Sequence, residues 1–168
     1  LVIFSGAPCA RRSRERRLGG VEASASPPLG LALYSRVMAT LLAHITVKPG
    51  EEERFESIAR TLYERTHAEE ADVRRYEYWR GSSPRTYYTL LSFDDHRGFI
   101  EHQVSDHHEE ASPAIGETVE SLRLEWVDPI ADASPLTATA MQSAPDGASE
   151  LTTTYTDRFA ADVADWWL

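Results

Sequence analysis

Four of the six histidines in this 168-residue chain lie within the stretch from Phe93 to His108. Histidine is the side chain whose unperturbed pKa lies closest to neutrality, so a cluster of this kind suits proton transfer or metal binding. Histidines at helix ends are also common for a structural reason, because the imidazolium interacts favourably with the negative end of the helix dipole. From the sequence alone, both interpretations of the cluster remain open.

A metal site in this stretch would combine three histidines with a glutamate, namely His102, His107 and His108 with Glu101 or Glu109. These residue types suit zinc or iron. The histidines are, however, separated by an expected helix break, and their spacing of five or six residues is not a recognised ligand spacing. We therefore expect no bound metal.

The same stretch predicts the local structure that positions the histidines. Asp94 and Asp95 follow a strand and are typical helix caps, so a short amphipathic helix closed by a histidine is expected after them. A second helical start is predicted at Ser105. This helix is expected to break or restart at Ser112-Pro113, because serine can cap a helix and proline can occupy its first turn.

Regular elements flank this stretch. Apolar alternation and β-branched composition predict four strands, at 39–47, 73–80, 85–93 and 121–127. Pro49-Gly50 ends the first strand, and an apolar stripe predicts the next helix, at Phe55, Ile58, Ala59 and Leu62. The order strand, helix, strand, strand, helix, strand indicates a ferredoxin-like α+β fold, in which two helices cover one face of a four-stranded antiparallel sheet.

Two helices leave the second face of the sheet uncovered. That face would carry His44 together with aliphatic and aromatic side chains, which is too much apolar surface to leave in water. We therefore expect a second copy of the chain to cover it, so that the protein is a homodimer.

The segments that flank the domain, which we place at 38–129, differ from it in composition. Residues 1–37 mix Arg, Ser, Gly and Pro without periodicity and are expected to be disordered, either as an artefact of start-site choice before Met38 or as a basic arm. Residues 130–151 predict a flexible linker. Residues 152–168 predict an amphipathic segment, with helical spacing at Phe159, Val163 and Trp166. We expect it to dock on this protein or its partner subunit; the alternative is that its terminal tryptophans bind another molecule.

Composition excludes several classes of partner. The formal net charge is −10, and residues 1–37 contain six Arg against two Glu, so the remainder is more acidic still. Such a surface repels phosphate backbones, which argues against nucleic acid. Cys9 is the only cysteine, so no disulfide framework is expected, and this suits a cytoplasmic protein. No apolar run reaches the roughly 20 residues that cross a bilayer, so a membrane partner is not expected.

Three local motifs carry a resemblance to a known family. They are Ile45-Thr46-Val47-Lys48-Pro49-Gly50, Arg75-Tyr76-Glu77 and Phe99-x-x-His102-x-x-Ser105-x-His107. Their order and spacing over roughly residues 39–128 resemble the antibiotic biosynthesis monooxygenase family, whose members are dimeric α+β barrels. Members include cofactor-free oxygenases that convert polycyclic phenols or quinols to quinones, and haem-degrading enzymes.

The resemblance implies a cofactor-independent monooxygenase that oxidises a quinol or polyphenolic aromatic with dioxygen, in secondary metabolism. Such chemistry needs an apolar slot, a base for the phenolic proton and donors for developing oxyanions. An alternative from another class is a non-catalytic dimeric barrel that binds an aromatic or lipid-like small molecule.

The resemblance also implies site residues. The catalytic candidates are His44, which lies mid-strand and could be the base, Tyr76 and His102. Substrate contacts are expected from Tyr78, Trp79, Tyr88, His107 and Trp126, although strand alternation prevents all of them from pointing inward.

Three departures from the family limit what can be carried over. The anthrone-type oxygenases use a pocket asparagine and a tryptophan, and this chain has no asparagine. The histidine that ligates haem in the haem degraders falls at Ser112, so haem is not expected. A glutamate frequent in the third strand of the family falls at Leu91.

Overall fold

The computed structural model describes residues 38–131, 133–161 and 163–164. The N-terminal extension, Trp166 and Trp167 lie outside these residues. In chain order the elements are β1 (Ala39–Val47), α1 (Glu52–Glu69), β2 (Val73–Arg80), β3 (Thr86–Phe93), α2 (His96–Gln103), α3 (Asp106–Thr118), β4 (Val119–Trp126), α4 (Glu150–Arg158) and β5 (Val163–Ala164). None of these helices has the length and apolar character needed to cross a membrane.

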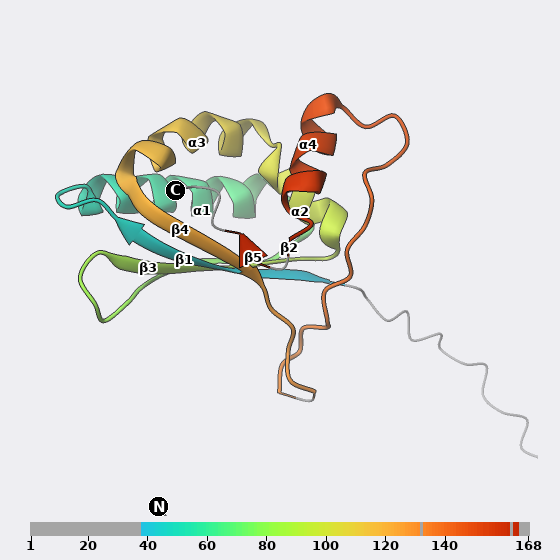
Figure 1. Cartoon of the computed structure of the whole chain (residues 1–168), viewed down its shortest axis with the longest axis horizontal. Coiled ribbons are helices and arrows are strands. Elements are labelled where there is room, and N and C mark those ends of the chain that lie inside the picture. The colour runs from blue at the N-terminus through green and yellow to red at the C-terminus, as the bar shows by residue number, and fades with distance from the viewer. Residues whose placement is uncertain (1–37, 132, 162, 165–168) are drawn as a thin grey trace, which may run out of the picture. The chain divides into compact units, whose positions relative to one another are not determined.

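The strands form one sheet in the order β2-β3-β1-β4-β5, with antiparallel neighbours throughout (Figure 1). The first four strands, α1 and the pair α2–α3 give the predicted ferredoxin-like α+β arrangement, which the structure confirms. Figure 1 shows the helices on the same side of the sheet. The prediction missed β5, which adds two residues to the edge beside β4.

Strand alternation decides which side chains face the helices. Ala43 of β1 lies opposite Thr89 of β3 and Leu124 of β4, and all three side chains line the space between the sheet and the helices. The neighbouring His44 therefore points to the other face of the sheet, where its side chain is 31% exposed.

Helix α1 covers the middle of the sheet with one face. It follows a turn in which Gly50 has a φ of +86°, a conformation that favours glycine. Its buried side chains recur at helical spacing, at Phe55, Ala59, Leu62 and Thr66. Full burial of a large apolar side chain stabilises a fold by about 1.5–3 kcal/mol, so this stripe fixes the helix on the sheet.

The caps predicted for the histidine stretch are confirmed, whereas the break at Ser112-Pro113 is wrong. Asp95 caps α2, and Ser105 caps α3 by accepting a hydrogen bond from the backbone N–H of His108. Helix α3 continues through Pro113 to Thr118. Proline removes only one helical hydrogen bond, and Pro113 is exposed, so water can reach the carbonyl group left without its partner.

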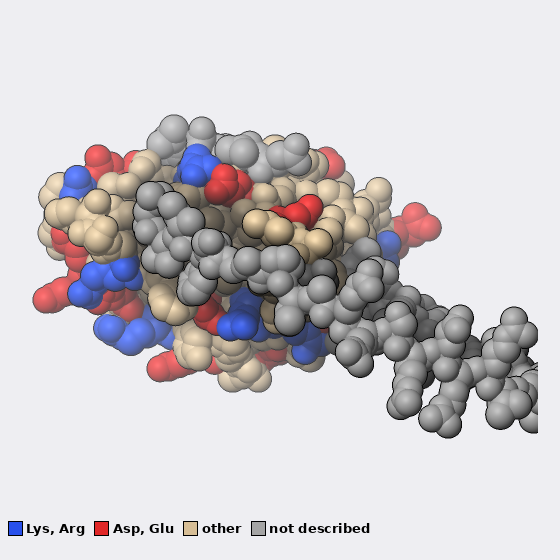
Figure 2. Space-filling view, turned by 90° about the horizontal axis from the view of Figure 1, so that it is seen from below, with Lys and Arg blue, Asp and Glu red and all other residues tan. Residues whose placement is uncertain are grey.

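The face of the sheet opposite the helices mixes apolar and charged groups. Arg75 and Glu77 of β2 form an ion pair of 2.9 Å, and His44 Nε2 lies 2.9 Å from Glu125 Oε1 of β4. Figure 2, which views the molecule from below, shows basic and acidic side chains close together around tan surface. These charged side chains on the open face of the sheet are therefore paired with one another.

The C-terminal segment packs beside α2 but is not one continuous helix. Tyr155 and Phe159 are buried, and the hydroxyl of Tyr155 donates to Glu109 of α3. The helix predicted from the spacing of Phe159 and Val163 ends at Arg158, because Val163 instead pairs with Glu125 in the sheet. The flexibility of the linker at 130–151 stays a prediction.

The first testable prediction concerns the α2 cap. Asp95 Oδ1 accepts a hydrogen bond of 2.9 Å from the backbone N–H of Gly98. We expect Asp95→Ala to lower the free energy of unfolding by about 1 kcal/mol, measured by urea denaturation, because this N–H loses its acceptor. Asp95→Asn keeps a capping oxygen and is the matched control. Equal stability of the wild type and the alanine variant would contradict the assignment.

Candidate functional site

A cavity of about 80 Å³ lies between the sheet and the helices. Its walls are mainly apolar and come from the first four strands, the first three helices and Phe159. The polar side chains that line it are Tyr76, Tyr78, Thr89, Gln103, His108 and Ser112. An apolar cavity with a few polar groups is the usual form of a small-molecule site.

Two polar atoms in the cavity wall are buried without a hydrogen-bond partner among the described residues. They are Nδ1 of His108 and Oγ1 of Thr89. Burial lowers the pKa of His108 to about 3, and His102 acts in the same direction, so its imidazole is neutral near pH 7. Since buried polar atoms are normally satisfied, these two atoms are positioned to contact a ligand or water.

Two tyrosines of β2 also line the cavity. The hydroxyl groups of Tyr76 and Tyr78 are 2.9 Å apart and hydrogen-bonded. Burial raises the pKa of Tyr78 to about 12 and raises the pKa of Tyr76 well above its ordinary value. Both phenols therefore stay protonated near neutral pH and can donate a hydrogen bond to an anion.

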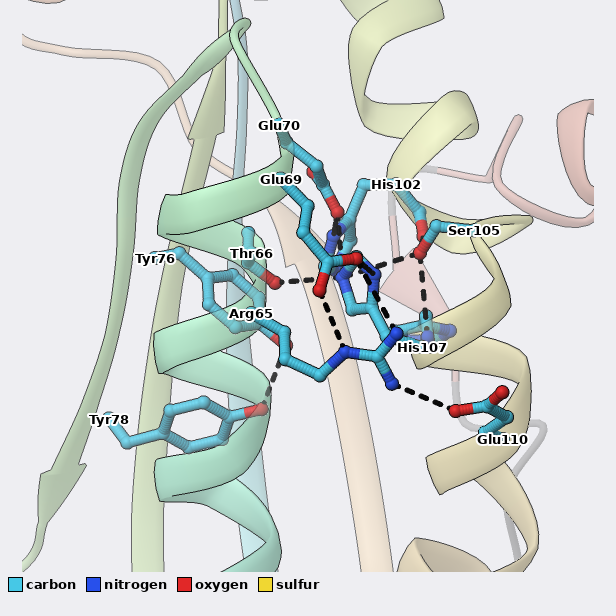
Figure 3. A network of polar contacts seen from close by, with 11 residues as sticks. Arg65, Thr66, Glu69, Glu70, Tyr76, Tyr78, His102, Ser105, His107 and Glu110 are labelled. Atoms are coloured by element: carbon cyan, nitrogen blue, oxygen red, sulfur yellow. Dashed lines mark hydrogen bonds and ion pairs between the residues drawn. The ribbon is translucent and has the colours of Figure 1, made fainter.

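Directly behind Tyr76 lies a second cluster, which contains His102 and His107 (Figure 3). The ring of His102 contacts the ring of Tyr76 at a centroid distance of 4.8 Å. Glu70 Oε1 lies 2.8 Å from His102 Nδ1 and 2.9 Å from His107 Nε2. Figure 3 shows Glu69 and Glu70, at the end of α1, reaching these two imidazoles. We call Glu70, His102 and His107 the histidine–glutamate cluster.

Burial changes the titration of this cluster. It raises the pKa of Glu70 to about 7 and lowers the pKa of His102 to about 3. Near neutral pH, His102 is therefore uncharged, while Glu70 is close to the midpoint of its titration. The two pKa values shift in opposite directions because burial disfavours the charged form, which is the deprotonated form of Glu70 and the protonated form of His102.

An open groove of about 540 Å³ lies beside the cavity, along the edge formed by β2 and α1. Phe55, Ala59 and Tyr78 line both the groove and the cavity. Trp79, whose side chain is 58% exposed, lines only the groove. The predicted substrate contacts Tyr78 and Trp79 thus belong to one continuous stretch of surface and cavity wall.

The structure does not bring the remaining predicted residues to the cavity. His44 and Tyr88 lie together on the opposite face of the sheet, with ring centroids 5.5 Å apart. Trp126 packs against Phe99 at 4.9 Å, and its indole donates a hydrogen bond to the backbone carbonyl of Phe159. His107 belongs to the histidine–glutamate cluster rather than to the cavity wall.

The sequence analysis did not select His108, Thr89 or Phe159 as site residues. His108 was considered only as a metal ligand. Thr89 lies on the same face of β3 as Tyr87 and Leu91, and this is the face that the helices cover. Phe159 lies about 50 residues after His108, and only the tertiary structure brings both to the cavity.

The structure is a ferredoxin-like α+β domain with an apolar cavity between its sheet and its helices. Residues 38–114 match the family model of the antibiotic biosynthesis monooxygenases, which identifies a domain of this family in that part of the chain. No curated protein matches the chain. The assignment of this domain therefore rests on its match to the family model.

Several solved structures share the fold. A protein of Caulobacter crescentus, named as a candidate antibiotic biosynthesis monooxygenase, is 23% identical, with a TM-score of 0.54 over 58% of this chain and 94% of its own. A protein of Shewanella oneidensis is 26% identical, with a TM-score of 0.51 over 55% and 90%. A similarly named protein of Bacteroides thetaiotaomicron is 16% identical, with a TM-score of 0.56 over 60% and 97%.

Proposed function

We propose that this domain is a monooxygenase that oxidises a quinol or polyphenolic aromatic with dioxygen and uses no bound cofactor. The observation that carries the proposal is the apolar cavity with an unpartnered His108 Nδ1 in one wall and the Tyr76–Tyr78 pair in another. Membership of the monooxygenase family supports the reaction class.

These groups can perform the first steps of the reaction. His108 accepts the phenolic proton, and the resulting electron-rich anion passes an electron to dioxygen. The pKa of His108 in the empty cavity is about 3, but a phenolate bound beside the imidazolium raises it because opposite charges stabilise each other. The Tyr76–Tyr78 pair donates a hydrogen bond to the developing oxyanion.

The volumes indicate how a ring system could fit. The cavity of about 80 Å³ is smaller than the roughly 150 Å³ of an engineered cavity that holds benzene. The groove of about 540 Å³ falls in the usual range for ligand sites. We infer that Phe55, which lines both spaces, moves aside so that the reacting ring enters the cavity while the rest of the substrate lies in the groove beside Trp79.

We further propose that a second copy of the chain covers the open face of the sheet. Leu42 and Leu90 are half-buried in the single chain, next to His44 and Tyr88. Aliphatic groups at the centre of a sheet face favour burial against another surface. Light scattering at micromolar concentration tests this, and a mass of one chain would contradict it.

The test of the proposed function is dioxygen uptake by the purified full-length chain over a panel of naphthohydroquinones, anthrones and catechols. We expect uptake with at least one substrate, unchanged by a metal chelator, and a change in the substrate spectrum. No uptake with any substrate, together with ligand-dependent tryptophan fluorescence, would instead support a non-catalytic protein that binds an aromatic or lipid-like molecule.

A further inference from the structure

We propose that the histidine–glutamate cluster is a binding site for a divalent transition-metal ion such as Zn²⁺. Glu70, His102 and His107 each offer one ligand atom, and these atoms all lie within 4.8 Å of one another. Glu70 directly follows α1, His102 belongs to α2 and His107 to α3. The site would therefore join three helices at one point.

The donor atoms suit such an ion in type and spacing. Two imidazole nitrogens and one carboxylate oxygen are a common ligand set for zinc, with water in the fourth position. Glu70 Oε1 lies 2.8 Å from His102 Nδ1 and 2.9 Å from His107 Nε2. Zinc bonds of about 2.0–2.1 Å in tetrahedral geometry place ligand atoms roughly 3.4 Å apart, so these contacts need to lengthen by only about 0.5 Å.

Neighbouring groups orient the two imidazoles. A histidine that binds a metal usually donates its other ring N–H to an oxygen. The carboxylate of Glu69 lies beside His107, with its Oε2 3.4 Å from Nδ1, and Arg65 holds the same carboxylate. His102 is fixed by packing instead, between the rings of Tyr76 at 4.8 Å and Phe93 at 5.1 Å.

Burial and charge also favour a cation. The side chain of His102 is 0% exposed and that of His107 is 3% exposed, whereas Glu70 is 15% exposed and gives a route from solvent. A buried carboxylate is costly unless it is paired or coordinates a metal. Among the described residues, the ion pairs of Glu70 are with His102 and His107. A divalent ion bound at this point would place a positive charge directly beside the carboxylate of Glu70.

None of the three ligands lines the cavity, but the ring of His102 contacts the rings of Tyr76 and His108, at centroid distances of 4.8 and 4.9 Å. The ion would hold the end of α1 against the junction of α2 and α3. The expected effect of the ion is therefore on the stability of the fold.

The test begins with the full-length chain freed of metal by a chelator. Zn²⁺ is titrated by calorimetry, and Co²⁺ by its visible absorption, which reports nitrogen and oxygen ligation. We expect one ion per chain and a higher midpoint of thermal unfolding with Zn²⁺, because an ion that binds only the folded state stabilises it. Absence of stoichiometric binding of both ions would overturn the proposal.

Two matched variants locate the ion. Glu70→Gln keeps the shape of the side chain, and we expect it to weaken Zn²⁺ binding by at least the roughly 10–100-fold that loss of an outer-shell partner costs. Glu125→Gln removes a carboxylate that contacts His44 at the same distance of 2.9 Å on the other face of the sheet, and should leave binding unchanged. Unaltered binding in the Glu70 variant, or equal loss in both, would place the ion elsewhere and refute the site.

Discussion

His108→Gln is expected to lower kcat for dioxygen-dependent oxidation by about 100-fold to 10,000-fold, the usual contribution of a general base. Glutamine is similar in size to histidine and can still form a hydrogen bond, but it cannot accept a proton at neutral pH. Substrate binding should therefore survive while proton transfer is lost. Steady-state dioxygen uptake should show the loss in kcat, with KM changed much less.

His44→Gln makes the same substitution on the other face of the sheet and separates the two hypotheses for the base. His44 is the base that the sequence predicted, whereas His108 is the histidine that lines the cavity. A loss of activity confined to the His108 variant would assign the base to the cavity. Loss confined to the His44 variant would contradict that assignment and move the site to the open face of the sheet. Circular dichroism of both variants provides the folding control.

The two hypotheses differ because they place the site on different faces of the sheet. His44 was predicted on the face that the helices leave uncovered, and the site was expected there, whereas the cavity lies between the sheet and the helices. In β1, Ala43 and His44 belong to different faces, and apolar residues occur on both sides of the strand. The sequence therefore predicted the strands, their order and the fold class. It placed His44 on the uncovered face, but it could not predict a cavity under the helices on the side of Ala43, because that depends on how the helix side chains pack against the sheet.

The histidine stretch shows the same limit on a helix. Consecutive helical residues point about 100° apart, so His107 and His108 have different surroundings. In the structure His107 contacts Glu70, whereas His108 lines the cavity. The cap at Ser105 could be predicted because it depends on local sequence, but the rotation of α3 about its axis depends on its contacts with α1.

The contact between Glu70 and His102 could not be predicted from the sequence for a further reason. Glu70 precedes His102 by 32 residues, whereas the candidate carboxylate ligands Glu101 and Glu109 are sequence neighbours of the histidines. The chain returns to this region because β2 and β3 form a hairpin between α1 and α2. Short-range spacing holds no information on such a contact.

Phe159→Ala is expected to lower the free energy of unfolding by about 3–5 kcal/mol, the usual cost of deleting a buried phenylalanine ring. The side chain of Phe159 is 4% exposed, and its ring contacts that of Phe99 at a centroid distance of 4.8 Å. Urea denaturation of both proteins measures the difference. Leu151→Ala, in the exposed part of α4, is the matched control and should change stability by no more than about 0.5 kcal/mol.

The size of this loss decides what the C-terminal segment contributes. Phe159 lies beyond residues 38–114, which match the family, and yet it lines the cavity. A loss of several kcal/mol would show that α4 belongs to the folded core in solution, so a segment outside the family match shapes the inner wall of the site. A loss below about 1 kcal/mol would contradict this packing, because no buried ring is deleted so cheaply. If the loss is several kcal/mol, Phe159→Ala also enlarges the cavity, and this variant should be tested for oxidation of bulkier aromatics.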